Sequence, residues 1–393
     1  TYIGIFIIMF SVISSGMVAV MTQNIGAGRP GVAYQARQLG LAFNAVLGVI
    51  MSLFLSLGAG TILSGVGVAD ALMQPAKTYL QIVGGFCILN ALIPICSSYL
   101  RAFGFSKEPL YASIIGNVIN FCLNAFFLFV LHKGVAGVAT ATVISRIINL
   151  VIVVLLGAVL VKAKQHPERE SNRAVMGQII RIGLPSACET AIYNVSMTLV
   201  IRFLNQMDAQ GLNVTARSYT MQITNFSYCV GAALAQANAI MTGWHIGAKE
   251  YDACDRGTKK AAVIGVIVAV ILETVFTLCS GWIMQLFSKD PQMVSLVGKL
   301  LAIDIVLEIG RVTNLVYGQA LKTSGDAVFP VVMGACFMIL CSVGGTYLFG
   351  IRLGLLAVGA YIGMTGDECV RAVGMYLRWK SGKWKEKGLV KSR

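Results

Sequence analysis

The run AAVIGVIVAVILETVFTLCSGWIM, residues 261–284, decides the fold class of this chain, because Glu273 is its only charged residue. An apolar helix of about 20 residues spans the hydrocarbon core of a bilayer, and FNAVLGVIMSLFLSLGAGTIL at 43–63 has the same character. Hydrophobic residues make up 56% of the 393 positions and charged residues 12%, about half the charged share of a soluble domain. The sequence therefore predicts an all-α polytopic membrane protein.

Apolar runs of this kind predict eleven membrane spans, and the charges between them predict the orientation. The spans cover 2–22, 39–64, 78–100, 109–131, 136–161, 183–204, 213–242, 261–287, 294–320, 328–350 and 353–377. If alternate connections share one side, that side and the C-terminal tail hold 21 Lys and Arg residues, against six on the other side. The positive-inside rule makes the richer side cytoplasmic. We therefore expect a multi-pass protein of the cell (inner) membrane with a cytoplasmic C-terminus, and membrane lipid rather than nucleic acid as the partner of its +14 net charge.

One hydrophilic corner occurs twice in the chain. NIGAGRPG at 24–31 and HIGAKEYD at 245–252 share the letters IGA at a separation of 221 residues. LRAFGFSKEP at 100–109 and LKTSGDAVFP at 321–330 repeat the same separation. A constant separation over so long a stretch indicates an internal duplication. Both corners fall on the predicted cytoplasmic side, which predicts parallel repeats, each with an even number of helices.

The duplication predicts two pseudo-symmetric six-helix bundles, of which this chain contains eleven of the twelve spans. The second copy has six spans and the first has five, so we expect a further helix before Thr1 in the full protein. The predicted domains are an N-terminal lobe at 1–161, a basic cytoplasmic linker at 162–182, a C-terminal lobe at 183–377 and a basic cytoplasmic tail at 378–393.

Several stretches resemble the multidrug and toxic compound extrusion (MATE) transporters. They are MVAVMTQNIGAGRPGVAYQARQLG (17–40), SYLRAFGFSKEPLYASIIGNVINFCLNAFFLF (98–129), GVAGVATATVISRIINL (134–150), IGLPSACETAIYNVS (182–196) and YLRWKSGKW (376–384). The resemblance implies twelve helices in two bundles around a central cleft, and export of organic compounds in exchange for Na⁺ or H⁺. In the fifth helix of that family an Asp often follows an Asn by four residues, whereas this chain has Asn120 followed by Asn124.

Glu189 is the first candidate for coupling to an ion gradient. It follows Pro185 by one helical turn, and a proline inside a helix removes a backbone hydrogen bond and loosens the helix. A carboxylate beside freed carbonyls can hold Na⁺ or exchange a proton. The alternative is a neutral carboxyl group that is hydrogen-bonded to a neighbouring helix.

Asp304 and Glu308 are the other candidates for ion coupling. Together with Arg311 they stand at i, i+4 and i+7 and so share one helix face. Arg311 can neutralise one of the two acids, which leaves the other free. Asp304 is the preferred residue for a cation site, and Glu189 and Asp304 are the candidate ligands for Na⁺. The alternative is a salt-bridge row that only locks packing. Their counterparts in the first copy are Val83 and Cys87, so the ion site is expected in the second lobe.

Other polar residues within the spans are candidates for lining the cleft. Most such residues hydrogen-bond neighbouring helices, and Glu273 is read as structural. The candidates are Tyr193, Gln222, Asn225, Arg311, Asn120 and Asn124.

These patterns favour a secondary active efflux transporter that exports amphipathic or cationic organic compounds in exchange for Na⁺ or H⁺ by alternating access. No GxxxxGK[ST] motif is present and the histidines and cysteines are scattered, so we expect neither an enzyme nor a bound cofactor. We also expect the protein to be a monomer. The alternative is a flippase for a lipid-linked sugar or cell-wall precursor, which a strongly cationic cavity would favour. Arg146 and Arg311 are taken as the only mid-span arginines, with acids to match them.

Overall fold

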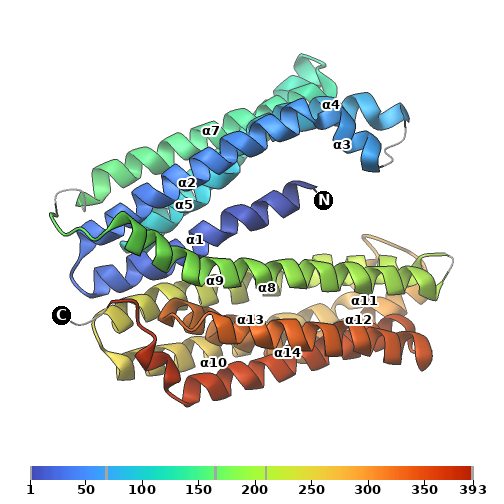
Figure 1. Cartoon of the computed structure of the whole chain (residues 1–393). Helices are drawn as coiled ribbons and strands as arrows, with labels where there is room; N and C mark the ends of the chain where they lie inside the picture. The colour runs from blue at the N-terminus through green and yellow to red at the C-terminus, as the bar shows by residue number, and fades with distance from the viewer. Residues whose placement is uncertain (1, 67–69, 163–165, 209, 391–393) are drawn as a thin grey trace. The chain divides into compact units, whose positions relative to one another are not determined.

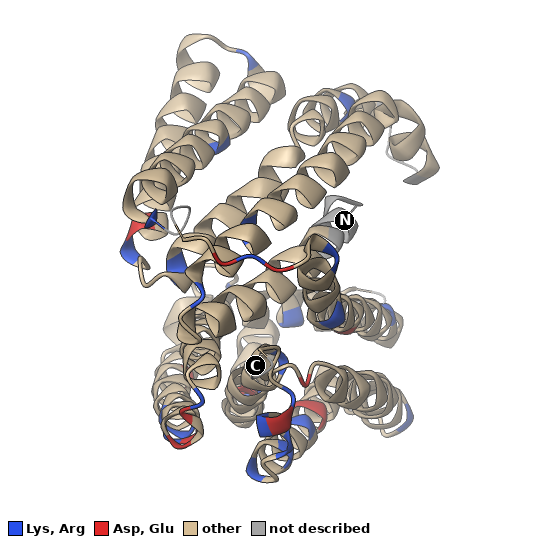
Figure 2. Ribbon diagram, turned by 60° about the vertical axis from the view of Figure 1, so that its left-hand side comes forward, with Lys and Arg blue, Asp and Glu red and all other residues tan. Residues whose placement is uncertain are grey.

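The computed structural model describes residues 2–66, 70–162, 166–208 and 210–390, and within them the regular structure is entirely helical (Figure 1). The chain divides into two compact units, Thr1–Leu184 and Pro185–Arg393. Most of each helix carries neither acidic nor basic residues (Figure 2). The all-α polytopic fold predicted from the sequence is confirmed.

Unit 1 contains seven α-helices and one π-helical segment among its described residues, followed by the start of α8. Its elements are α1 (Tyr2–Gly26), α2 (Pro30–Leu57), α3 (Ala59–Val66), α4 (Asp70–Gly85), α5 (Ile88–Ala102), α6 (Lys107–Ala125), the π-helical η1 (Phe126–Val130) and α7 (Gly134–Leu160). The helix α8 (Asn172–Met207) crosses the boundary between the units at Pro185.

Unit 2 continues from Pro185 of α8. Its further elements are α9 (Leu212–Gly247), α10 (Tyr251–Leu278), α11 (Ser280–Met284), α12 (Pro291–Ser324), α13 (Val328–Phe337), η3 (Met338–Val343), η4 (Thr346–Arg352), α14 (Leu356–Lys380) and η5 (Lys383–Glu386). The segments η3 and η4 are π-helical, and such segments are often found at functional sites.

Helix boundaries recur at the separation that the sequence predicts. Both ends of α2 reappear 221 residues later as the ends of α10, and α3 and α11 begin at the same separation. Two positive φ angles recur with them: 72° at Gly28 against 61° at Lys249, and 89° at Gly104 against 99° at Gly325. The two copies therefore share turn geometry as well as sequence. They differ at α4 and α5, which meet at a 41° bend where α12 is continuous.

The sequence predicts eleven membrane spans, but fewer helices than that are long and apolar enough to cross a membrane by composition alone. Five qualify among the described residues, and six if the bent pair α4–α5 is one span. The long helices α8, α9, α12 and α14 are absent from this set, because polar and charged residues interrupt their apolar runs. Four starts also precede the predicted ones by eight residues or more: α2 begins at Pro30 rather than 39, α4 at Asp70 rather than 78, α10 at Tyr251 rather than 261, and α8 at Asn172, inside the predicted linker.

Close packing places α12 at the centre of unit 2. A Cβ atom added to Gly231 of α9 or Gly265 of α10 would lie 2.8 or 2.7 Å from a methyl group of Val312. A Cβ atom added to Gly310 would lie 2.9 Å from the backbone nitrogen of Cys369 in α14. Such contacts are shorter than van der Waals packing allows, so these glycines permit α9, α10 and α14 to approach α12 closely.

The predicted tail is folded against unit 2 over its first residues. The rings of Trp379 and Trp384 stack with centroids 4.1 Å apart, and Trp379 Nε1 donates a hydrogen bond to Asp255. Arg378 Nε lies 2.7 Å from an Asp326 oxygen. The basic segment after α14 therefore begins as part of the folded unit.

Candidate functional site

Two cavities lie among the helices of unit 2. The first, of about 270 Å³, is called the Asp304 pocket. Helices α8, α9, α12, η3 and α14 line it with Tyr193, Met197, Arg217, Met221, Thr224, Asn225, Tyr228, Asp304, Leu307, Arg311, Ser342, Tyr361, Met364, Asp367 and Glu368.

The second cavity, of about 240 Å³, is called the Glu189 pocket. It shares four lining residues with the Asp304 pocket, namely Tyr193, Tyr228, Arg311 and Glu368. The others are Glu189, Thr190, Asn314, Leu315, Gly318, Gln319, Lys322, Met338 and Arg371.

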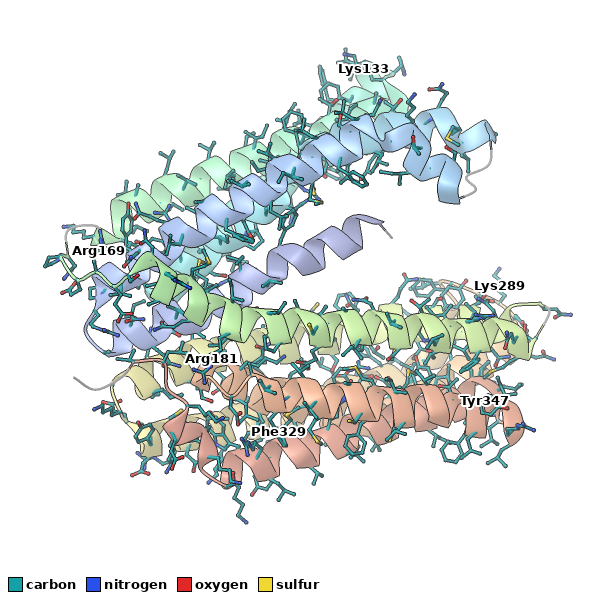
Figure 3. All side chains as sticks on the ribbon, in the orientation of Figure 1. Lys133, Arg169, Arg181, Lys289, Phe329 and Tyr347 are labelled. Atoms are coloured by element: carbon teal, nitrogen blue, oxygen red, sulfur yellow. The ribbon has the colours of Figure 1, made fainter. Side chains whose placement is uncertain are left out.

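The two pockets follow one another along α12. Figure 3 places Lys289, just before α12, at one end of unit 2 and Phe329, just after it, toward the other. Along α12 the Asp304 pocket takes its lining from 304 to 311, and the Glu189 pocket from 311 to 322. Arg311 therefore separates the two cavities, and the Asp304 pocket is nearer the Lys289 end.

A buried ion-pair network connects α12 and α14. Arg311 pairs with Glu308 and lies 3.7 Å from Glu368. Arg371 lies 2.8 Å from Asp367 and 2.9 Å from Glu368. The close contact at Gly310 brings the two helices near enough for these side chains to meet.

Hydroxyl and amide groups complete the network. Ser342 of η3 donates a hydrogen bond of 3.0 Å to Asp367, and Asn314 of α12 donates one of 3.0 Å to Glu368. Charge-assisted hydrogen bonds of this kind are about twice as strong as neutral ones, so Asp367 and Glu368 are well-satisfied carboxylates.

Three other buried acids are incompletely satisfied. Among the described residues, Oδ2 of Asp304 and Oε2 of Glu308 find no hydrogen-bond partner, and neither oxygen of Glu273 makes a hydrogen bond of ordinary geometry, although Ser227 faces it. Arg311 supplies a counter-charge to Glu308. An isolated charge inside a membrane costs roughly 2.5–3.5 kcal/mol on insertion scales, so Asp304 and Glu273, which form no ion pair in the described part of the chain, need a proton or a cation. Asp304 is the one of the three that lines a pocket.

Glu189 and Asp304 are not brought together. The Glu189 carboxylate is paired with Lys322 Nζ at 2.6 Å in its own pocket, so the two predicted Na⁺ ligands belong to different cavities. Lys322, one of the Lys and Arg residues on the predicted cytoplasmic side, has a side chain that is 14% exposed and pairs with Glu189. The described residues contain no group of three or more His, Cys, Asp or Glu arranged to hold a metal ion.

The remaining candidates fall into three groups. Tyr193 lines both pockets, and Asn225 lines the Asp304 pocket beside Arg311. Gln222 is exposed on α9 and belongs to neither lining. Asn124 donates to Asn120, which donates to Ser145 of α7, so in unit 1 this pair forms the hydrogen-bonded contact between α6 and α7.

Several charged residues of the site were not predicted from the sequence. Asp367, Glu368 and Arg371 stand at i, i+1 and i+4 within a predicted span, a spacing that forms ion pairs on one helix face, and that signal was available. Arg217, near the start of the predicted span 213–242, is likewise buried, in α9. Arg217 and Arg371 therefore join Arg146 and Arg311 as arginines inside predicted spans.

Comparison with known proteins identifies relatives along almost the whole chain. The uncharacterized transporter YisQ of Bacillus subtilis is 32% identical over 99% of this chain and 86% of its own length. A probable multidrug resistance protein, NorM of Thermotoga maritima, is 22% identical over 96% of this chain and 82% of its own.

Solved structures share the fold. A MATE crystal structure in a bent conformation matches 97% of this chain and 86% of its own with a TM-score of 0.88 at 18% identity. An outward-facing multidrug resistance MATE transporter matches 100% of this chain and 87% of its own with a TM-score of 0.86. The MatE family model matches residues 1–126 and 185–348, so this chain belongs to the MATE family of multi-pass membrane transporters.

Proposed function

We propose that this protein exports amphipathic or cationic organic compounds in exchange for Na⁺ or H⁺ by alternating access. The observation that carries the proposal is Asp304, a carboxyl group that is 2% exposed, lacks a partner for Oδ2 and lines a pocket. Such a group binds either the coupling cation or the positive group of a substrate. Exchange then follows, because the two cannot occupy it together.

The walls of the Asp304 pocket suit a varied organic cargo. Met197, Met221 and Met364 supply flexible, polarisable thioethers, and Tyr193 and Tyr228 supply aromatic rings, that of Tyr228 with the Arg311 guanidinium 6.0 Å from its centroid. Methionine adapts to irregular shapes, and aromatic faces attract cations. The pocket therefore favours flat amphipathic compounds that carry positive charge.

The charge of the two linings supports efflux over lipid-linked sugar flipping. The acidic and basic side chains are equal in number, at four each: Glu189, Asp304, Asp367 and Glu368 against Arg217, Arg311, Lys322 and Arg371. A flippase for anionic lipid carriers is expected to have a strongly cationic cavity. The equal numbers of acidic and basic side chains in these linings do not match that expectation.

The proposed setting is the cell (inner) membrane with the C-terminus in the cytoplasm, as the distribution of Lys and Arg predicts. The Lys289 end of unit 2 then faces outward, which makes the Asp304 pocket the outer of the two cavities. Glu189, neutralised by Lys322, lies in the inner one and is proposed to exchange partners during the cycle. Neither role requires a bound cofactor.

The test is dye export from proteoliposomes in which the Na⁺ gradient and the pH gradient are imposed one at a time. Ethidium serves as the cationic probe, and empty vesicles and the Asp304→Asn variant serve as controls. We expect one gradient to drive ethidium against its concentration in the wild type and neither to do so in Asp304→Asn. Gradient-independent movement of the dye, or full-rate export by Asp304→Asn, would contradict the proposal.

A further inference from the structure

The segment 381–390, which follows α14, is fastened to unit 2, and we call it the strap. Trp384 of the strap is 1% exposed, and its ring centroid lies 5.9 Å from that of Tyr251, the first residue of α10. A Cβ atom added to Gly325 would lie 2.3 Å from the carbonyl oxygen of Lys387. The strap backbone is therefore packed against the corner between α12 and α13, and its position is fixed.

The strap has a counterpart in unit 1. Residues 166–171 follow α7 as the strap follows α14, and they lie on the first turns of α2. Gln35 Nε2 donates a hydrogen bond of 2.7 Å to the carbonyl oxygen of Glu170, and Arg169 Nη1 donates one of 2.6 Å to that of Gly31. Since α2 and α10 are the same helix of the two copies, each copy ends in a segment that packs against the start of the same helix.

The outer side of the strap carries lysines, and the start of α10 adds further cations beside them. Lys385 Nζ lies 6.0 Å from the centroid of the Tyr251 ring, which joins the strap to the start of α10. We define the strap patch as five exposed cations at this end of unit 2, none of which lies within 4.0 Å of a carboxylate among the described residues: Arg256, Lys260, Lys380, Lys383 and Lys385.

Most acids near the strap patch already have a basic partner. These pairs are Asp255 with Lys259, Asp326 with Arg378, and Glu250 with His245. Asp252 and Glu386 are exposed and form no ion pair in the part of the chain that the structure describes. Five cations against two acids leave an excess of three positive charges, so the strap patch attracts anions.

Exposed apolar surface begins next to the strap patch on two helices. On α10, Lys260 is followed at helical spacing by the exposed Ile264 and Ile267. On α14, Lys380 follows the exposed Leu377 by three residues. A lysine at the end of an apolar membrane-facing stripe extends its ammonium group to the level of the lipid headgroups. This arrangement matches a ligand with a charged head and long apolar chains.

We infer that the strap patch binds the headgroup of an anionic phospholipid, whose acyl chains lie along the exposed faces of α10 and α14. The lysine ammonium groups donate hydrogen bonds to the phosphate oxygens, and clusters of Lys and Arg beside membrane-spanning helices attract anionic lipids. A zwitterionic lipid carries its own cation and gains less. Because the bound headgroup contacts both the strap and the ends of α10 and α14, it also holds the strap in place.

The test measures the preference of the protein for an anionic lipid over a zwitterionic one. The purified full chain in dodecyl maltoside is titrated with dioleoyl phosphatidylglycerol or with dioleoyl phosphatidylcholine, and bound lipids are counted by native mass spectrometry. The double variant Lys383→Gln with Lys385→Gln removes two charges from the strap. The double variant Lys133→Gln with Lys289→Gln is the matched control, because it removes two exposed lysines that lie outside the strap patch.

We expect the wild type to bind phosphatidylglycerol more tightly than phosphatidylcholine. Each lysine near an anionic headgroup contributes about a fivefold preference, so the loss of Lys383 and Lys385 should reduce the ratio of the two affinities by about 25-fold. The control variant should keep the wild-type ratio. An equal reduction in both double variants, or no reduction in either, would overturn the inference.

The variant Trp384→Ala separates a fixed site from a mobile basic tail. It retains every charge but removes the ring that packs against Tyr251, so the preference for phosphatidylglycerol should fall. A full preference in Trp384→Ala would overturn the inference, because an unanchored tail would then be sufficient. Displacement of phosphatidylglycerol by an equal concentration of glycerol phosphate would also overturn it, since the strap patch would then be a site for any phosphate.

The lipid test and the transport test can fail separately, because lipid binding depends on the charges of unit 2 and not on the direction or substrate of transport. A wild type that exports ethidium under an ion gradient but shows no preference between the lipids overturns this inference alone. A wild type with the lipid preference but no gradient-driven export supports this inference and counts against the proposed function.

Discussion

The Arg371→Gln variant tests how strongly the buried ion pairs of α14 stabilise unit 2. Arg371 is 3% exposed and makes three contacts of 2.8–2.9 Å with Asp367 and Glu368. Glutamine removes the charge and leaves Asp367 buried with Ser342 as its hydrogen-bond donor, while Glu368 keeps Asn314 as a donor and the Arg311 guanidinium at 3.7 Å. Removing one partner of a buried pair costs about 3–5 kcal/mol, so we expect the free energy of unfolding to fall by about that amount.

The chain offers a matched control for this substitution. Lys259 and Asp255 form an ion pair of 2.7 Å at the same i, i+4 spacing, but on the surface. Lys259→Gln should leave stability close to that of the wild type, because water solvates the remaining Asp255 carboxylate once the pair is broken. Both variants can be unfolded by SDS in mixed micelles and followed by tryptophan fluorescence, which reports on the stacked rings of Trp379 and Trp384.

A triple variant separates pairing from packing. Asp367→Asn, Glu368→Gln and Arg371→Gln together leave no unpaired charge, so most of the stability lost in Arg371→Gln should return. If Arg371→Gln loses no more stability than Lys259→Gln does, the reasoning from burial is refuted.

Three other substitutions test separate features. Asp304→Asn and Glu189→Gln should each abolish gradient-driven export while the protein stays monodisperse on size exclusion, and full-rate export from either would refute its assigned role. Gly310→Val should separate α12 from α14 and lower thermal stability in detergent, by about 1–3 kcal/mol for overpacking, and an unchanged melting temperature would disprove the close contact. Asp208, in the loop before α9, is slightly desolvated, which raises its pKa, but hydrogen bonds from Asn213 outweigh this and hold the pKa below its usual value. Asp208→Asn should therefore be less stable than the wild type at pH 7, with the difference shrinking as pH falls below about 4, and a pH-independent difference would contradict this.

The repeat, and with it most of the fold, could be predicted from the sequence because short stretches of similar residues recur at a constant separation. The corner between two helices has a residue with a positive φ angle at Gly28 in the first copy and at Lys249 in the second. The same holds for the corners at Gly104 and Gly325. Helix starts were less predictable: α8 begins at Asn172 among polar residues, where hydropathy gives no signal.

The site could be predicted only where its contacts are local. Glu308 and Arg311 are one turn apart, and their ion pair follows from the spacing. The pairing of Glu189 with Lys322 joins α8 to the end of α12, and no local pattern encodes it. Gln222 and Asn225 are three residues apart on α9, yet only Asn225 lines the Asp304 pocket, a distinction that depends on the neighbouring helices.

Substrate-driven ion movement tests the central claim most directly, because coupling must work in both directions. Proteoliposomes with no initial ion gradient are given an ethidium gradient, and luminal pH and ²²Na⁺ are followed together. We expect H⁺ or Na⁺ to move opposite to the dye in the wild type and this flux to disappear in Asp304→Asn. Dye movement without any counter-flow of either cation, or an unchanged counter-flow in Asp304→Asn, would contradict it.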